Sequence, residues 1–142
     1  MQLSRFTDYS LRVLFYVATH NDRLCTLAEI ANYYDISIEH LRKVVHSLAK
    51  SGELETFRGK NGGIRLRPPA SEINIGEVIA QTEGINPLIN CSAQQCCLTG
   101  ICSLEQALAE AQLAFMNVLK KYTLADMLRH PKMQQQLISS SH

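Results

Sequence analysis

The sequence of 142 residues has no apolar run long enough to cross a membrane, because His, Asn, Arg or Glu interrupts its longest hydrophobic stretches. Residues 1–5 do not lead into a long apolar stretch with a small-residue cleavage site, so a signal peptide is not indicated. We therefore expect a cytoplasmic protein. The hydrophobic content of 46% suits one compact domain, or one domain with a dimerisation arm.

The sequence also lacks the residue patterns that catalysis requires. It contains no internal repeat, no low-complexity segment, and no pattern that indicates a nucleophile–base pair or a catalytic pair of acids. The glycine-rich stretch from Gly59 to Gly63 lacks the spacing and the Lys-Ser/Thr ending of a phosphate-binding loop. We therefore expect that the protein is not an enzyme.

The net charge is only +1, but the charged residues are unevenly distributed. Residues 1–70 contain 10 Lys or Arg against 7 Asp or Glu, whereas residues 71–142 contain 4 against 6. Between residues 36 and 70 the counts are 7 and 3. A mildly basic half suits contact with phosphates, although an ordinary solvated surface would carry the same charges.

Three helices are expected in the first third of the chain, over residues 8–20, 26–34 and 37–51. Thr7 is the expected cap of the first helix. Thr26 and Glu29 have the spacing of a capping box, in which hydroxyl and carboxylate satisfy free amide groups. Gly52 is well placed to end the third helix. The short connection between the last two helices indicates a helix-turn-helix unit.

The third helix has the amphipathic pattern of a DNA-recognition helix. Its apolar positions, which we expect to pack inward, are Leu41, Val44, Val45 and Leu48. Its polar positions point the other way and are His40, Arg42, Lys43, His46, Ser47 and Lys50. A side chain array of this kind can be offered to a major groove. Any three-helix bundle would give a similar pattern, so the next segment decides between the two interpretations.

A basic β-hairpin is expected directly after this unit. The pattern predicts a strand over residues 53–57, a glycine-rich turn over 58–63 and a returning strand over 64–66. The polar residues concentrated there are Arg58, Lys60, Asn61, Arg65 and Arg67. Such a hairpin is typical of the wing of a winged-helix domain, whose tip can lie along the DNA backbone or enter the minor groove. We expect DNA contacts from His40, Arg42, Lys43, His46, Ser47, Arg58, Lys60, Asn61, Arg65 and Arg67.

The second half of the chain predicts a long helix after an irregular loop. We expect a short helix over residues 74–84, a loop over 88–102, and a helix from Leu104 to about Tyr122 with Ser103 and Gln106 as its capping box. One apolar seam runs along the long helix through Leu104, Leu108, Ala111, Phe115, Val118 and Tyr122. Pairing with a second copy is the natural use of this seam, and packing on its own domain is the alternative.

The fold class is therefore expected to be mainly α, a winged helix-turn-helix domain with a β-hairpin wing and a long C-terminal dimerisation helix. A short helix starts at Thr123, and we expect the tail from Pro131 to be frayed, since it has little apolar content. The expected regions are a DNA-binding domain (1–84), a cysteine loop (85–103), a dimerisation helix with the short following helix (104–130) and a tail (131–142).

Four of the five cysteines lie between residues 91 and 102, with the spacing Cys91-x4-Cys96-x5-Cys102 and Cys97 next to Cys96. Thiols stay reduced in the cytoplasm, so a disulfide framework is not expected. Soft thiolates at short spacing suit zinc or an iron–sulfur cluster, and the absence of paired C-x2-C motifs favours the cluster. Redox thiols are the remaining alternative. The isolated Cys25 is more typical of a small buried apolar residue.

These motifs together resemble the NsrR/IscR family of iron–sulfur transcription regulators, over about residues 1–130. The resemblance rests on residues 6–9 (FTDY), the wing residues 58–66 (RGKNGGIRL), the three spaced cysteines and residues 122–126 (YTLAD). It implies a homodimer joined by the long helices and a partly palindromic double-stranded operator. It also implies a cluster on Cys91, Cys96 and Cys102.

The NsrR-like branch, which represses transcription and senses nitric oxide, is more similar to this sequence than the IscR-like branch. It implies a 4Fe–4S cluster whose fourth ligand is a carboxylate from the other subunit, at the position of Asp8. Without the resemblance, Asp8 is a first-turn acid or the i,i+4 partner of Arg12. IscR-like members have a ligating His where this chain has Glu105, which argues against a 2Fe–2S site, although Glu105 or Cys97 could ligate instead.

Two other functions remain. A regulator of the same fold could sense iron–sulfur status or redox state through a 2Fe–2S cluster. A small electron carrier is a different class, but such a protein needs neither a recognition helix nor a basic wing, so residues 36–67 argue against it.

Overall fold

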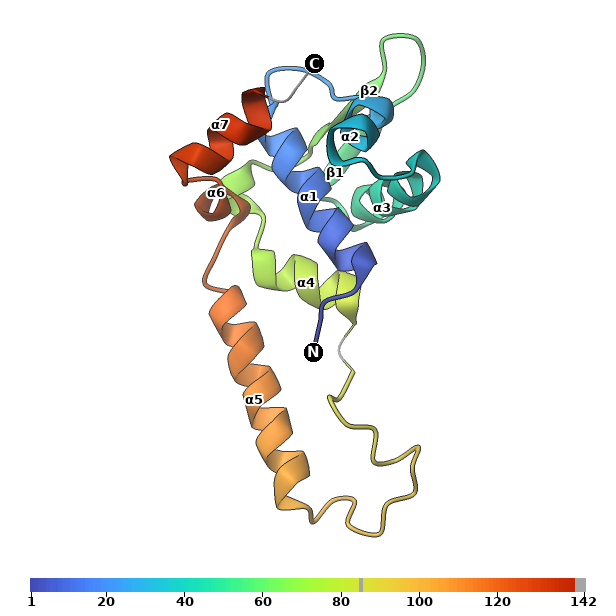
Figure 1. Ribbon diagram of the computed structural model, residues 1–142, viewed down its shortest axis with the longest axis vertical. Coiled ribbons are helices and arrows are strands. Elements are labelled where there is room, and N and C mark those ends of the chain that lie inside the picture. Colours follow the sequence, from blue (N-terminus) through green and yellow to red (C-terminus); the bar gives the residue numbers. More distant parts are fainter. Residues whose placement is uncertain (85, 140–142) are drawn as a thin grey trace.

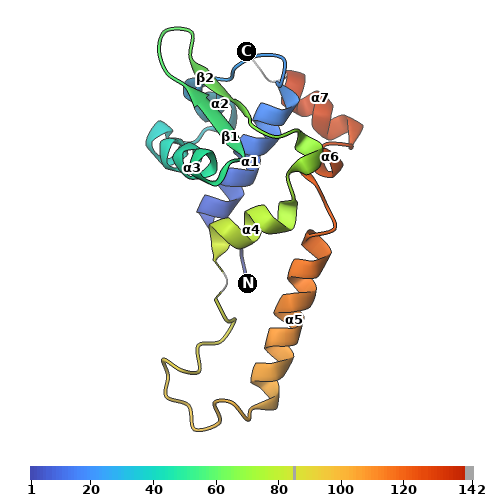
Figure 2. The same cartoon turned by 180° about the vertical axis from the view of Figure 1, so that it is seen from behind.

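The computed structural model describes residues 1–84 and 86–139 of the chain. Its elements are α1 (Arg5–Thr19), α2 (Leu27–Tyr34), α3 (Ile38–Ser51), β1 (Leu54–Phe57), β2 (Gly63–Leu66), the 3-10 helix η1 (Ala70–Glu72), α4 (Ile75–Glu83), α5 (Ser103–Leu119), α6 (Leu124–Met127) and α7 (Pro131–Ser139). Figure 1 shows a helical body from which α5 and the cysteine loop extend as an arm, and Figure 2 shows the same arrangement from behind. Within the described part of the chain, no helix is long and apolar enough to cross a membrane.

The winged-helix body forms as its pattern predicts. The capping box of Thr26 and Glu29 is present at the start of α2, and Ser37 caps α3 by accepting a hydrogen bond from the amide of His40. Gly52 ends α3 in the left-handed conformation, with φ of 97°. The four apolar positions predicted to face inward on α3 are all buried. Each fully buried side chain of this kind contributes roughly 1.5–3 kcal/mol, so the amphipathic pattern fixes which face of α3 is left to solvent.

The first helix begins three residues earlier than the pattern predicts, and the prediction that Thr7 is its cap is wrong. Ser4 is the cap, because its hydroxyl oxygen accepts a hydrogen bond from the amide of Thr7. The Thr7 side chain is fully buried, and its hydroxyl donates to the carboxylate of Glu83 at the end of α4. A distant carboxylate therefore uses the hydroxyl that the sequence pattern assigned to helix capping.

The wing is a two-stranded antiparallel hairpin with an isolated bridge to Cys25 on its other side. Leu54 pairs with Leu66 and Phe57 with Gly63, so the turn spans residues 58–62. The Cys25 backbone pairs with Ile64 from the other side of β2. A Cβ added at Gly63 would lie 2.8 Å from both the Cys25 carbonyl oxygen and the Leu24 Cβ. Glycine at this position is what lets β2 approach the segment before α2.

The long helix α5 joins the body beside the start of α4, where the Asn74 side chain donates to the Lys120 carbonyl, and it exposes most of its surface. None of the 17 residues of α5, all of which the structure describes, is buried. The helix ends at Leu119, before the expected end at Tyr122. The predicted capping box of Ser103 and Gln106 is also wrong, since Cys102 occupies the cap position without a side-chain cap bond.

The segment after α5 returns to the body. The expectation that the tail from Pro131 is frayed is wrong for residues 131–139, which form a helix. Residues 131–139 form α7, whose Leu137 is buried together with Leu124 and Leu128 in the core shared with α1. The Tyr33 hydroxyl donates to the Gln136 carbonyl at 3.1 Å. A few well-placed apolar side chains therefore suffice to dock a mostly polar helix. Ile85 and residues 140–142, at the edges of two of the expected regions, lie outside the described residues.

Candidate functional site

The outward face of α3 carries most of the residues predicted to contact DNA. Arg42, Lys43 and His46 are exposed, and Ser47 is half-buried. The Arg42 guanidinium forms an ion pair with Glu39 one turn earlier. His40 is also half-buried, because its ring meets the Tyr9 ring edge-on with the centroids 4.7 Å apart. The structure therefore places His40 at the junction of α1 and α3 rather than in the middle of the exposed face.

The wing presents the remaining five predicted residues to solvent, namely Arg58, Lys60, Asn61, Arg65 and Arg67. Arg65 is held in place, since its Nε lies 3.2 Å from a Glu55 carboxylate oxygen and its guanidinium carbon lies 4.9 Å from the centre of the Phe57 ring. Phe57 is itself 39% exposed. Phe57 is not among the residues predicted to contact DNA. A large aromatic residue at the solvent-facing end of a short strand is the sequence feature that would have indicated it.

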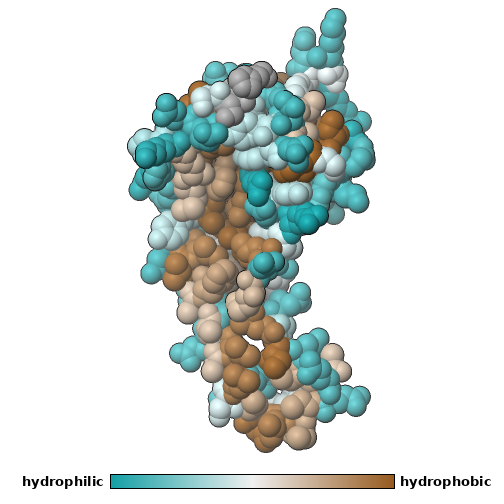
Figure 3. Space-filling model, in the orientation of Figure 1, coloured by the Kyte–Doolittle hydropathy of each residue, from teal (hydrophilic) through white to brown (hydrophobic). Residues whose placement is uncertain are grey.

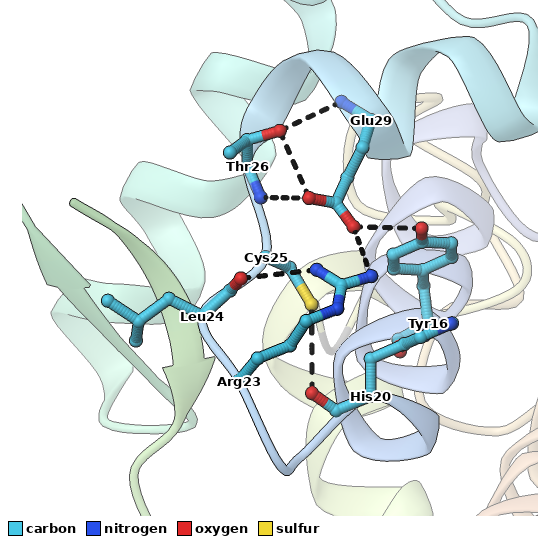
Figure 4. Close-up of polar contacts among 7 residues, drawn as sticks. All are labelled: Tyr16, His20, Arg23, Leu24, Cys25, Thr26 and Glu29. Atoms are coloured by element: carbon cyan, nitrogen blue, oxygen red, sulfur yellow. Dashed lines mark hydrogen bonds and ion pairs between the residues drawn. The ribbon is translucent and has the colours of Figure 1, made fainter. Parts of the chain in front are cut away.

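A polar cluster fixes the base of the wing, as Figure 4 shows. The Glu29 carboxylate accepts hydrogen bonds from the Tyr16 hydroxyl at 2.9 Å and the Thr26 amide at 2.8 Å, and pairs with Arg23 at 2.7 Å. Partial burial alone raises the pKa of Glu29, but the bonds from Arg23, Thr26 and Tyr16 outweigh it and lower that pKa to about 2. The sequence pattern found the capping box but not Arg23 or Tyr16, since only the fold brings them there.

Cys25 lies in the same region and is a structural residue. Its side chain is completely buried and its thiol faces the carbonyl oxygen of His20 at 4.0 Å (Figure 4). Burial, with the nearby Glu29 charge as a smaller cause, raises the pKa of the Cys25 thiol to about 11. A thiol that stays protonated at neutral pH is a poor metal ligand or nucleophile. The expectation that Cys25 is a small buried apolar residue is therefore confirmed.

The other four cysteines lie in the loop at the far end of the arm (Figure 1). All four are free thiols: Cys91 is buried, Cys102 is half-buried, and Cys96 and Cys97 are exposed. Within residues 1–84 and 86–139, no three His, Cys, Asp or Glu side chains gather closely enough to hold a metal ion. The structure brings the predicted ligands into one loop but not to ligating distances.

Two side chains of α5 fasten this loop to the arm. The Gln112 amide donates to the Asn86 carbonyl at 2.7 Å, near the start of the loop. The Gly100 amide donates to the Glu105 carboxylate at 3.0 Å, near its end. Between these points, the Thr99 hydroxyl donates to the Cys96 carbonyl at 2.8 Å. Glu105, on α5, therefore has a structural partner in the loop.

The donor set fits an iron–sulfur cluster in number and chemistry. Burial raises the pKa of the Cys91 thiol, and the neighbouring charges of Glu105, Cys96 and Cys102 raise it further. Thiolates that repel one another at close range are stabilised when cationic iron lies between them, which is why metal binding releases thiol protons. Ligation by the three spaced cysteines would leave one ligand to be supplied, by Cys97, by Glu105 or from outside the loop.

Asp8, the fourth ligand implied by resemblance, is engaged within its own helix. Its two carboxylate oxygens accept hydrogen bonds from Nε and Nη2 of Arg12, both at 3.0 Å. Arg12 also lies 5.8 Å from the ring centres of Tyr9 and Tyr34. The hydrogen bond with Asp8 outweighs partial burial and raises the pKa of Arg12. The Asp8 side chain is 46% exposed, so a partner molecule can reach it.

An exposed basic helix, a basic hairpin after it and a helical body define a class of protein, the winged-helix transcription regulators. The family model named Rrf2, described as an iron-dependent transcriptional regulator, matches residues 3–130. The chain belongs to the Rrf2 family.

Solved structures of the same fold include three regulators from bacteria. IscR of T. potens is 24% identical with a TM-score of 0.71, and the alignment covers 91% of this chain and 87% of that one. CymR of B. subtilis, described as a global cysteine regulator, is 23% identical with a TM-score of 0.75, covering 89% and 95%. The oxidised form of Staphylococcus aureus CymR is 27% identical with a TM-score of 0.71, covering 92% and 98%. These likenesses support the winged-helix fold.

Proposed function

We propose that the protein is a DNA-binding repressor whose operator affinity is controlled by an iron–sulfur cluster that responds to nitric oxide. The observation that carries this proposal is a three-cysteine loop fastened to the same chain as a recognition helix and a basic wing. Residues 1–84 read DNA, residues 85–103 hold the cluster, and residues 104–130 join two subunits. Of the tail (131–142), helix α7 (Pro131–Ser139) packs on the DNA-binding body.

The α5 helix supplies the surface for a dimer. Leu104, Phe115 and Val118 of the predicted seam are 58%, 47% and 49% exposed. Figure 3 shows hydrophobic surface that continues from the body along the arm. A lone subunit would leave this apolar surface in water, whereas a second α5 covers it. Two recognition helices joined in this way read the two half-sites of a partly palindromic operator.

Cys91, Cys96 and Cys102 hold the cluster, which we propose to be of the 4Fe–4S type, and the partner subunit's Asp8 completes the ligand set. A hard carboxylate oxygen is a weaker ligand for such a cluster than a fourth thiolate, so the iron that it holds is the point open to nitric oxide. Asp8 must leave Arg12 to ligate, and it returns to Arg12 when ligation is lost.

The contacts of α1 connect this exchange to DNA binding. Tyr9 follows Asp8 directly, flanks Arg12, and packs edge-on against His40 of α3. A change in the partner of Asp8 can therefore reach the recognition helix through Tyr9, which packs on His40 of α3. The half-sites of an operator lie about 34 Å apart, so a small shift between two recognition helices spoils the fit to both.

An anaerobic titration tests this function. Cluster-loaded protein is bound to operator DNA, nitric oxide is added in steps, and the cluster absorption and DNA anisotropy are followed together. We expect both to fall in parallel. If the absorption bleaches while DNA affinity stays unchanged, the sensing mechanism is wrong. Cys91→Ala, Cys96→Ala and Cys102→Ala should each lose the cluster, whereas Cys97→Ala and Cys25→Ala serve as controls that keep it.

A second candidate is a regulator of the same fold that senses iron–sulfur status or redox state through a 2Fe–2S cluster. The absence of the IscR-like His at position 105 counts against it, but the Glu105 carboxylate acts on Cys91 within the same subunit and is available to ligate in place of that His. Iron and sulfide counts on anaerobically purified protein separate the two candidates. The counts and the absorption spectra of Glu105→Gln and Cys97→Ala then show whether either residue takes the place proposed for Asp8.

A further inference from the structure

We infer that Glu83 is a positioning residue for Asp8: it fastens the first turn of α1, where Asp8 lies, to the point where the cysteine loop begins. This inference rests on the proposed role of Asp8 as a ligand and adds to it the group that orients Asp8. Glu83 is the last residue of α4, and Gly84 begins the loop with φ of 82°. One side chain thus lies between the two parts of the chain that we propose to supply cluster ligands.

The contacts of Glu83 join segments that are far apart in the sequence. Its Oε2 accepts a hydrogen bond from the Ser4 amide at 2.9 Å and one from the Thr7 hydroxyl at 2.5 Å. Its Oε1 lies 3.2 Å from the same Ser4 amide. Ser4 also caps α1, and the Asp8 amide donates to the Ser4 carbonyl at 3.0 Å. Asp8 therefore belongs to the one helical turn that Glu83 fixes at both ends.

The electrostatics of this contact are favourable. The first turn of a helix has free amide groups and a partial positive charge, so an ionised carboxylate placed there is stabilised. The hydroxyl bond from Thr7 and the amide bond from Ser4 lower the pKa of Glu83, so it is ionised at neutral pH. Charge-assisted bonds to two fixed donors restrict the helix more than neutral bonds would. Thr7 is fully buried, which leaves its hydroxyl no water as an alternative partner.

The loop side of the contact is equally constrained. Two residues after Gly84, the Asn86 carbonyl is held by Gln112 of α5. Glu83 is therefore held against α1 and Asn86 against α5, on either side of the point where the loop begins. In Figures 1 and 2, α4 ends beside the start of α1, whereas α5 reaches the body at the other end of α4. In the proposed dimer, Asp8 of each subunit ligates the cluster held by the loop of the other subunit. Glu83 therefore connects the Asp8 that its own subunit supplies to the partner with the loop that holds its own cluster.

Hydrogen exchange and cluster lifetime in Glu83→Ala test this inference. In cluster-free protein, the amides of residues 4–8 should exchange at least about tenfold faster, because the carboxylate that holds this turn through the Ser4 amide and the Thr7 hydroxyl is gone. In cluster-loaded protein, the absorption should decay roughly tenfold faster in the presence of a chelator, the usual size of such indirect effects on a metal site. Glu77→Ala, an exposed carboxylate on the same helix, is the matched control and should change neither.

Two further variants guard against general loss of structure. Thr7→Val removes the 2.5 Å hydrogen bond from the α1 side while preserving the side-chain shape, and it should accelerate decay in the same direction. Glu83→Gln keeps an oxygen acceptor without the charge and should restore part of the lifetime. If exchange at residues 4–8 rises in Glu83→Ala while the cluster decays at the wild-type rate, Glu83 is purely structural and the inference is overturned.

The decisive comparison uses Asp8→Ala as the background. If Glu83 acts through Asp8, adding Glu83→Ala to Asp8→Ala should not accelerate decay further. Equal acceleration in both backgrounds overturns the inference. If Asp8→Ala itself has the wild-type spectrum and lifetime, the proposed ligand is wrong and the inference falls with it. If Asp8→Ala changes the cluster lifetime and Glu83→Ala does not, the role of Glu83 alone is overturned and the proposed function stands.

Discussion

Cys25 and Ile64 pair through two backbone hydrogen bonds, 2.9 Å from the Cys25 amide to the Ile64 oxygen and 2.7 Å in the opposite direction. This pairing attaches the wing to the segment that joins α1 to α2. Because β2 has β1 on one side and Cys25 on the other, the hairpin is fixed at its base while residues 58–62 stay free to meet DNA. The position of the basic wing relative to α3 thus depends on this pair.

Cys25 should be the least reactive of the five thiols. Its side chain is completely buried and its pKa is about 11, so very little thiolate is present near neutral pH. Alkylation of cluster-free protein with iodoacetamide, followed by peptide mass mapping, should label Cys96 and Cys97 first. Cys25 should be labelled only after unfolding. Labelling of Cys25 at the rate of Cys97 in the folded protein would contradict the structural role given to it.

Gly63→Ala should loosen the wing and weaken binding to all DNA sequences. The new Cβ would lie 2.8 Å from the Cys25 carbonyl oxygen, a fixed backbone atom, so β2 must move away. Overpacking of this kind costs about 1–3 kcal/mol of the free energy of unfolding. Denaturant unfolding and an operator titration measure the two effects. Thr56→Ala, an exposed change on the other strand, is the control and should alter stability by less than about 0.5 kcal/mol.

Glu29→Gln should remove an acid-dependent part of the stability. The pKa of Glu29 falls from 4.5 to about 2 on folding, so its contribution is complete above pH 4.5 and is lost as the pH falls through about 2. The Glu29 side chain is 25% exposed, and after allowance for solvent screening we expect a loss of about 2 kcal/mol near neutral pH. Unfolding of both proteins at several pH values checks this.

The difference between the wild type and Glu29→Gln, rather than the wild-type curve alone, is the quantity that tests the assignment, since other carboxylates titrate in the same range. That difference should shrink steadily between pH 4.5 and about 2. A difference that stays constant over this range would mean that the charge of Glu29 is not what stabilises the base of the wing.

Local patterns predicted the helix-turn-helix and wing well, because their caps and turns involve residues close in sequence. Thr26 caps α2 through Glu29 three residues later, and Gly52 ends α3, so both signals are complete within a few residues. The cap of α1 is Ser4 rather than the predicted Thr7, whose hydroxyl donates to Glu83, 76 residues away. No local pattern contains that partner.

The candidate cluster site was predictable only in part. Cysteine spacing identified one loop of thiols, and in the structure these thiols are free and the loop is fastened to α5. The i,i+4 spacing of Asp8 and Arg12 indicated their pairing as the alternative to ligation, and the structure shows that pair. The sequence could not show that Glu105 accepts from the Gly100 amide, because that contact depends on how the loop folds back on α5. The docking of α7 through Leu137 was missed because it too depends on contacts that spacing does not encode.

Lys60→Ala and Arg42→Ala should weaken DNA binding in different ways. Lys60 lies exposed at the tip of the wing, where phosphate contact is expected, so its removal should lower affinity about equally for all sequences and reduce the salt slope by about 1. Arg42 lies exposed on α3, so its removal should also change sequence preference, by about 1–3 kcal/mol for a contacted base. Titrations of operator and scrambled DNA at several salt concentrations separate the effects. Wild-type binding by both variants would contradict the winged-helix interface.

Phe115→Asp should separate the dimer and abolish tight operator binding. Phe115 lies in the middle of the exposed α5 seam and is 47% exposed in the single subunit. A second α5 packed over this position would bury the new carboxylate without a partner, at a cost of several kcal/mol.

Leu113 is the matched control: it is 62% exposed, but at about 3.6 residues per turn it lies on the opposite side of α5 from the seam. Sedimentation should therefore show monomers for Phe115→Asp and dimers for Leu113→Asp. Because two half-sites need two linked recognition helices, only Phe115→Asp should lose operator affinity. If both variants stay dimeric, the subunits meet through another surface; if Leu113→Asp alone dissociates, the partner covers the opposite face of the arm.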